Sequence, residues 1–166
     1  MLHLFILYLS SVFILPMLAE IDDPSTFKKF IPNNWSYLAH AKGDLNKDKI
    51  DDLVLIIQSN TPSETIEDDY YDEDFKIYDR SMIILFGEND RRNYRQVIRN
   101  NKLIKHAESR VVSDPFSDLS IERGNIILKF NYWTSAGSWW TSKDTFVFRY
   151  QNFDFALIGY EGDLFH

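Results

Sequence analysis

Oxygen-bearing side chains recur at alternate positions in one short segment of the chain, at Asp44, Asn46 and Asp48, and again at Asp52. A chain that curls around an ion can direct every second side chain inward, and the main-chain carbonyl of Ile50 lies where it fills the remaining gap. Calcium prefers carboxylate, amide and carbonyl oxygens. The spacing therefore predicts a calcium loop with these five residues as ligands.

The same residues also form a hairpin without an ion. Short Asp and Asn side chains accept hydrogen bonds from main-chain N–H groups two residues further on, which makes Asx turns at Asp44, Asn46 and Asp48. Lys47 and Lys49 place two cations beside the loop, and both weaken metal affinity. Two interpretations stay open: a calcium site no tighter than about 10⁻⁴ M, and a metal-free hairpin.

The residues after the loop separate it from an EF-hand. An EF-hand has Glu at its twelfth position, where this chain has Leu55, and a helix follows, whereas Leu53–Ile57 is an apolar, strand-like run. Residues 43–54 resemble the FG-GAP or VCBS type of calcium-loop repeat, whose pattern is D-x-[DN]-x-D-G-x-x-D-L before a strand. The resemblance implies the same five ligands. Lys49 stands where that family has Gly, and we expect it to adopt a left-handed backbone at a cost of about 1 kcal/mol.

Short β-branched and aromatic runs predict the elements that position this loop. They are Leu53–Ile57, Met82–Phe86, Ile126–Phe130, Thr145–Tyr150 and Phe153–Tyr160, bounded by Gly, Asn and Asp. Arg123–Asn125 and Gln151–Asn152 predict hairpin turns. One short helix is expected, with Asp23 as its cap, Pro24 at its first position and Pro32 at its end. The predicted fold is mainly β, an antiparallel meander of about six to eight strands, sandwich-like or a partial propeller, with one short N-terminal helix.

Length and composition bound the organisation of the chain. It has 166 residues, no cysteine and a formal net charge of -7. Cysteine-ligated zinc and disulfide scaffolds are excluded, and an acidic chain disfavours nucleic-acid binding. Residues 1–19 carry no charge and contain an apolar run too short to span a bilayer, so they predict a signal peptide cleaved after Ala19, with an uncleaved anchor as the alternative. The mature product, residues 20–166, is then a single β-rich domain, exported to the periplasm or secreted, without membrane contact.

Two segments are candidates for binding a protein partner. The acidic loop at residues 64–74 contains Asp68, Asp69, Tyr70 and Tyr71, and an aromatic cluster at residues 132–140 contains Trp133, Trp139 and Trp140. Complementary charge accelerates encounter, and Trp and Tyr are frequent hot-spot residues. The alternatives are that the acidic segment is a solvated loop and that the aromatic side chains fill the β core.

No sequence signature of catalysis stands out. The four histidines are not at metal-binding spacing with one another, and neither a nucleophile elbow nor a phosphate-binding glycine loop occurs. We therefore predict no catalytic residue and a non-catalytic exported β domain that binds a macromolecular partner. The alternative is a periplasmic immunity or inhibitor protein that neutralises a toxin or hydrolase; a hydrolase that uses paired carboxylates is a lesser alternative.

Overall fold

Ten β-strands and one helical turn make up the parts of the chain that the computed structural model describes, which are residues 25–67, 73–89, 93–133 and 141–165. In chain order they are α1 (Ser25–Lys28), β1 (Trp35–Gly43), β2 (Asp52–Ser59), β3 (Glu64–Ile66), β4 (Phe75–Ile77), β5 (Arg80–Gly87), β6 (Tyr94–Asn100), β7 (Phe116–Glu122), β8 (Asn125–Trp133), β9 (Thr141–Gln151) and β10 (Asp154–Phe165).

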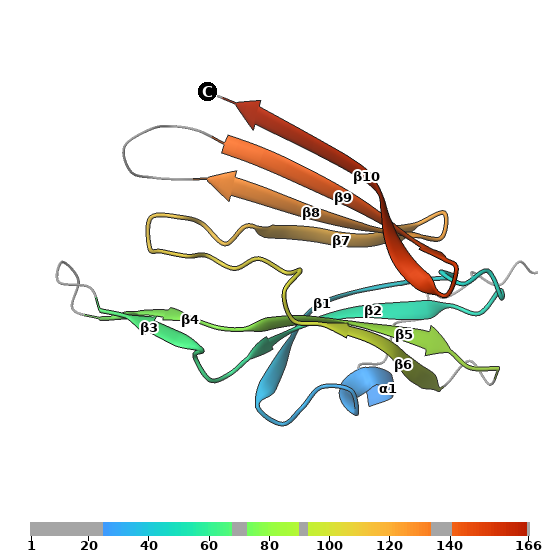
Figure 1. The fold of residues 1–166 in the computed structure, drawn as a ribbon. Coiled ribbons are helices and arrows are strands. Elements are labelled where there is room, and N and C mark those ends of the chain that lie inside the picture. Colours follow the sequence, from blue (N-terminus) through green and yellow to red (C-terminus); the bar gives the residue numbers. More distant parts are fainter. Residues whose placement is uncertain (1–24, 68–72, 90–92, 134–140, 166) are drawn as a thin grey trace, which may run out of the picture.

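The strands form two four-stranded antiparallel sheets and a small ribbon. The first sheet has the order β1-β2-β5-β6, the second has the order β10-β9-β8-β7, and β3 pairs with β4. Figure 1 shows the two sheets as two layers, with the β3–β4 ribbon extending to one side of the first. This confirms the mainly β prediction in its sandwich-like form. Ten strands exceed the predicted six to eight because β1, β6 and β7 mix polar with apolar residues, and β3 and β4 have three residues each.

Apolar side chains from both sheets form the main core. Val54, Ile56 and Ile84 of the first sheet pack with Ile126 and Leu128 of the second, and all five are almost fully buried. The opposite face of β2 and β5 is also covered. Leu53, Leu55, Ile57, Ile83 and Leu85 pack there beneath the Phe27 side chain of α1. Because both faces of β2 and β5 are buried, these strands appear in the sequence as unbroken apolar runs.

The predicted N-terminal helix is present only as the single turn α1. Its expected cap, Asp23, and Pro24 lie outside the described residues. After Lys28 the chain tightens, and the N–H groups of Phe30 and Ile31 donate to carbonyls three residues earlier, at 2.9 Å and 3.1 Å. The described segments contain no helix of the length and apolarity needed to cross a membrane.

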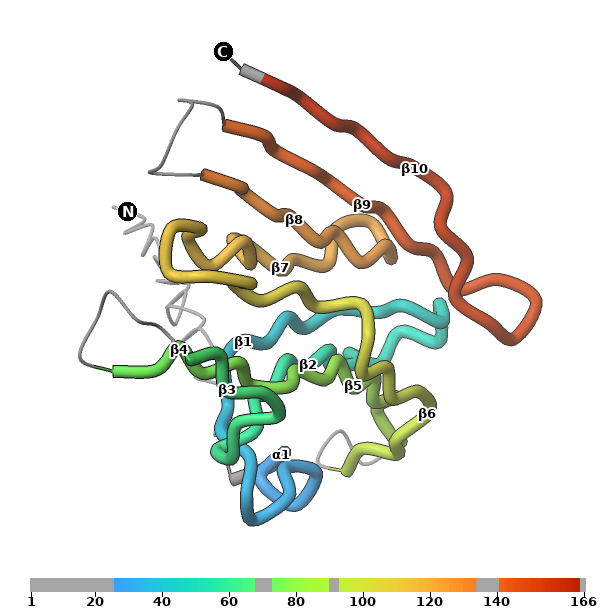
Figure 2. Tube along the Cα trace, turned by 60° about the vertical axis from the view of Figure 1, so that its left-hand side comes forward, coloured from blue at the N-terminus to red at the C-terminus, as the bar shows by residue number. Residues whose placement is uncertain are grey.

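The two sheets lie close at one end of the sandwich and diverge towards the other. At the close end, the Phe86 ring of the first sheet contacts the rings of Tyr150 and Phe155 beside the β9–β10 turn, with centroid separations of 5.0 Å and 6.4 Å. Figures 1 and 2 agree that β10 is the strand of the second sheet farthest from the first sheet. The second half of β10 therefore extends beyond the cover that the first sheet provides.

Candidate functional site

The predicted calcium loop connects β1 to β2. Its side-chain oxygens are engaged by main-chain N–H groups: Asp44 Oδ1 accepts from Lys47 at 2.6 Å and its Oδ2 accepts from Lys49 at 3.0 Å. Asn46 Oδ1 accepts from the N–H of Asp48 at 2.9 Å, and Asp48 Oδ1 accepts from Ile50 at 2.8 Å. The contacts of Asn46 and Asp48 are Asx turns, whereas Asp44 accepts from N–H groups three and five residues further on. Together these contacts hold the loop in a tight curl.

Two lysines of the loop have left-handed backbones. Lys49 has φ 68°, as its place at the family's Gly position predicts, and Lys47 has φ 66°, which the sequence analysis did not anticipate. A side chain with a Cβ atom adopts this conformation at a cost of about 1–2 kcal/mol. The network of Asx hydrogen bonds holds both residues in this strained form.

Asp52 anchors the loop to the first sheet. Its carboxylate is fully buried and accepts hydrogen bonds from the N–H groups of Leu45 at 2.8 Å, Asn46 at 3.2 Å and Gly87 at 3.0 Å. Burial raises the pKa of the Asp52 carboxyl above its ordinary value, and the three N–H donors oppose that rise. Asp52 therefore joins the start of β2 to the end of β5.

In this conformation, side-chain oxygens of the loop accept hydrogen bonds from its main-chain N–H groups. The amide nitrogen of Asn46 donates to Asp48 Oδ2 at 2.9 Å. Within the described ranges, no group of three His, Cys, Asp or Glu side chains converges to hold a metal ion. The donor types suit calcium, and calcium binding by Asp44, Asn46, Asp48, Ile50 and Asp52 stays a prediction.

Most of the predicted partner-binding residues lie outside the described residues. These are Asp68, Asp69, Tyr70 and Tyr71 of the acidic loop, and Trp139 and Trp140 of the aromatic cluster. Trp133 is described: it is the last residue of β8 and is 44% exposed. The Trp133 side chain therefore does not fill the β core, contrary to the alternative for the aromatic cluster.

The β10 strand presents an apolar surface that the sequence analysis did not identify. Leu157, Tyr160 and Leu164 are 53%, 61% and 60% exposed, and they are referred to below as the β10 surface. Their cross-strand partners Phe148, Phe146 and Ser142 establish which face they occupy, because directly paired residues of an antiparallel sheet share a face. Phe146 and Phe148 pack against the core, so the β10 surface continues the core-facing side of the second sheet.

Aromatic contacts connect the β10 surface to the core. The ring of Phe146 contacts two other rings. Its centroid lies 5.9 Å from that of the buried Phe130 ring and 5.0 Å from that of the Tyr160 ring. The Tyr160 hydroxyl donates to Asp144 Oδ1 at 3.0 Å, and that hydrogen bond raises the pKa of the Tyr160 phenol. A Cβ atom at Gly162 would lie 2.4 Å from the same hydroxyl, so Gly162 leaves the space that Tyr160 needs. Tyr160 is therefore an exposed ring held in a fixed position.

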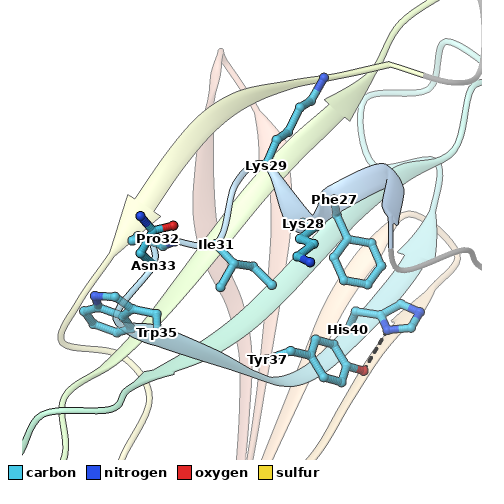
Figure 3. Close-up of a pocket in the computed structure, with 9 residues that line it drawn as sticks. All are labelled: Phe27, Lys28, Lys29, Ile31, Pro32, Asn33, Trp35, Tyr37 and His40. Carbon is cyan, nitrogen blue, oxygen red and sulfur yellow. Dashed lines mark hydrogen bonds between the residues drawn. The ribbon is translucent and has the colours of Figure 1, made fainter.

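A groove lies on the other side of the molecule, between α1 and β1. Its volume is about 1040 Å³, and Figure 3 shows aromatic side chains along it with two lysines at its rim. The Tyr37 hydroxyl and His40 Nδ1 are hydrogen bonded at 2.8 Å, and the buried Phe27 ring packs against both residues. His40 is thus a packed residue with ring partners.

Comparison of the chain with protein-family models, with curated proteins and with solved structures found no match in any of the three.

Proposed function

We propose that this protein is a non-catalytic, exported domain that binds a protein partner through the β10 surface. One observation carries the proposal: three large apolar side chains, Leu157, Tyr160 and Leu164, lie uncovered on the core-facing side of the second sheet. Contiguous apolar groups that a domain leaves open are typical of interaction sites, since their burial by a partner is favourable.

The fixed position of Tyr160 supports the same function. Tyrosine is enriched among residues that dominate binding energy, and a side chain already held in its bound position loses less entropy on association. The contacts of Tyr160 with Phe146, Asp144 and Gly162 provide that order before a partner arrives.

The experiment compares partners that co-purify with the protein from the exported fraction of its native host. Replacing Leu157, Tyr160 and Leu164 together by Ser removes the β10 surface and is expected to abolish a stoichiometric partner. The matched control is Val111→Ser, which removes an exposed apolar side chain elsewhere. Retention of the partner by the triple variant, with a native circular dichroism spectrum, contradicts the proposal.

A specific feature favours the second candidate, an immunity or inhibitor protein. The β3–β4 ribbon extends away from the sandwich and flanks the acidic segment, with Glu64, Glu67, Glu73 and Asp74 all exposed. A basic toxin or hydrolase complements such an arm in charge. Replacing Glu64, Glu67 and Glu73 by Lys is expected to abolish capture and inhibition of such an enzyme if this candidate is correct, while the triple serine variant of β10 keeps both.

A further inference from the structure

We propose that β10 binds its partner by strand addition: an extended partner segment with alternating apolar and basic residues pairs with the free edge of β10 and becomes the fifth strand of the second sheet. This inference rests on the function proposed above and specifies how the partner is recognised. It starts from the edge position of β10 in the order β10-β9-β8-β7.

The edge of β10 has few of the features that normally protect a sheet edge. Proteins blunt such edges with short strands, lysines, prolines or bulges, because a free edge offers a row of unpaired main-chain N–H and C=O groups. β10 has 12 residues, and no Lys, Arg or Pro occurs between Asp154 and Phe165. Its one irregularity is a bulge between Leu157 and Gly159. The strand therefore offers a long template for pairing.

The two faces of β10 differ in a way that defines the partner's chemistry. One face carries the β10 surface. The other face follows from the register with β9, which pairs Ala156 with Arg149, Glu161 with Thr145 and Asp163 with Lys143. Successive side chains of an added strand alternate between the same two faces. Apolar residues of the partner would lie beside Leu157, Tyr160 and Leu164. The intervening residues would lie beside Asp154, Glu161 and Asp163, of which Asp163 also faces Lys143 of β9.

The acidic residues of β10 favour basic residues at those intervening positions of the partner. β10 contains Asp154, Glu161 and Asp163 and no basic residue. Directly opposed charges of unlike sign stabilise a strand pair, and like charges destabilise it. The same argument disfavours a second copy of this chain as the occupant, because two β10 strands would bring six acidic side chains and no cation to one seam. A Lys- or Arg-bearing segment from a different protein fits both faces.

The first test uses a fluorescent ten-residue peptide of alternating Lys and Val as the probe. We expect saturable binding to the purified protein, with ¹H–¹⁵N chemical-shift changes concentrated at the amides of residues 154–165. The same peptide with N-methyl groups on alternate residues keeps its side chains but cannot pair along that edge. We expect its affinity to fall about tenfold or more, equivalent to about 1.4 kcal/mol.

Charge reversal gives the second test. Glu161→Lys is expected to weaken the Lys–Val peptide and to tighten an alternating Glu–Val peptide. Glu122→Lys, an exposed substitution at the end of β7, is the matched control and leaves both affinities unchanged. Equal binding of the N-methylated peptide, or shift changes away from β10, overturns strand addition. Concentration-dependent dimerisation that protects the β10 amides overturns it in favour of a second copy.

The outcomes also separate strand addition from the function proposed above. If the triple serine variant loses its partner while N-methylation does not weaken the peptide, the β10 surface binds a partner and strand addition is wrong. If the triple serine variant keeps its partner, the proposed function fails, and strand addition fails with it because both require the same strand.

Discussion

Individual residues of the β1–β2 loop hold a strained backbone in place, with Lys47 and Lys49 both at positive φ. The left-handed backbone of Lys49 follows from its position in the motif, and φ 68° confirms it. Of the three Asx turns predicted for the metal-free hairpin, those at Asn46 and Asp48 are present. Asp44 instead accepts from N–H groups three to five residues further on. The three N–H partners of Asp52 were not predictable, because the Gly87 donor lies 35 positions along the chain and meets Asp52 only through the pairing of β2 with β5.

Lys49→Gly is expected to stabilise the protein by about 0.5–1 kcal/mol. Glycine adopts positive φ without the steric penalty of a Cβ atom. The relief of that penalty exceeds the free-energy cost of glycine's greater entropy in the unfolded chain. Urea unfolding measures the change. Lys76→Gly in β4 is the control: its backbone has no positive φ, so the substitution is expected to give no stabilisation. Equal effects at both positions would show that the loop conformation is not strained.

Tyr160 is expected to ionise at a higher pH than an ordinary tyrosine. Its hydrogen bond to Asp144 favours the protonated phenol and raises its pKa. The stabilising contribution is therefore present below the ordinary tyrosine pKa of about 10 and is lost as the pH rises through the higher folded value. Asp144→Asn removes the carboxylate charge and is expected to lower the Tyr160 pKa.

Tyrosine-ring NMR titration measures that difference, and Tyr160→Phe identifies the signal. An unchanged titration curve in Asp144→Asn would show that Asp144 does not hold the phenol in place.

Among the elements, the β1–β2 loop also joins the two sheets. Asp52 accepts from Gly87 at the end of β5, and the Asp44 carbonyl lies close to Gly124 of the β7–β8 turn, where an added Cβ would be 3.1 Å from that oxygen. Gly124 has φ 73°, so both its conformation and its space require glycine. The loop therefore contacts both the end of β5 in the first sheet and the β7–β8 turn of the second.

Gly87→Ala is expected to destabilise the protein by about 1–3 kcal/mol, because its Cβ would lie 2.4 Å from the carbonyl oxygen of Asp51 and force the loop to move. Gly159→Ala is the matched control. Its Cβ would meet Val147 at 3.5 Å, an ordinary contact, and the expected change is below about 0.5 kcal/mol. Thermal unfolding compares the two variants. Equal stabilities would show that the close contact between Gly87 and the loop does not stabilise the protein.

Calcium is expected to stabilise the same loop. Calcium that binds only the folded state raises the free energy of unfolding. With a dissociation constant near 10⁻⁴ M, the increase at 10 mM calcium is up to about 2.7 kcal/mol. Asp48→Ala is expected to abolish the rise in melting temperature, whereas Asp51→Ala, which changes an exposed neighbour that is not among the predicted ligands, preserves it. Magnesium at equal concentration controls for ionic strength. Identical melting curves in calcium and in chelator would reject the metal prediction and leave the Asx hairpin unaffected.

The β-branched and aromatic runs predicted five of the strands, β2, β5, β8, β9 and β10. The runs within β2, β5 and β8 were predicted because their buried positions hold β-branched and aliphatic residues. β1 and β6 were missed because each has at least one solvent-facing side and carries polar or charged residues there. β7 was implied only by the predicted turn at Arg123–Asn125, which lies between β7 and β8. The predicted turn at Gln151–Asn152 lies one residue further on, at Asn152 and Phe153, both with positive φ. Phe153 is 94% exposed, an environment that its residue type alone does not predict.

At the scale of the whole molecule, the important property is that the two sheets cover each other incompletely. Phe155 packs against the core near the turn, whereas Leu157, Tyr160 and Leu164 further along β10 do not. The sequence does not distinguish these residues, because the apolar positions of β10 look the same whether or not another layer covers them. Exposure depends on the strand order of the second sheet and on its divergence from the first, which are properties of the tertiary structure.

Site-specific photo-crosslinking in the native host shows whether the β10 surface contacts a protein partner. A benzophenone amino acid in place of Tyr160 is expected to yield one major adduct with another protein. The same amino acid in place of Lys129, which is exposed on the opposite face of the second sheet, is expected to yield none. Absence of an adduct at position 160, or the same adduct at both positions, would contradict the proposed function.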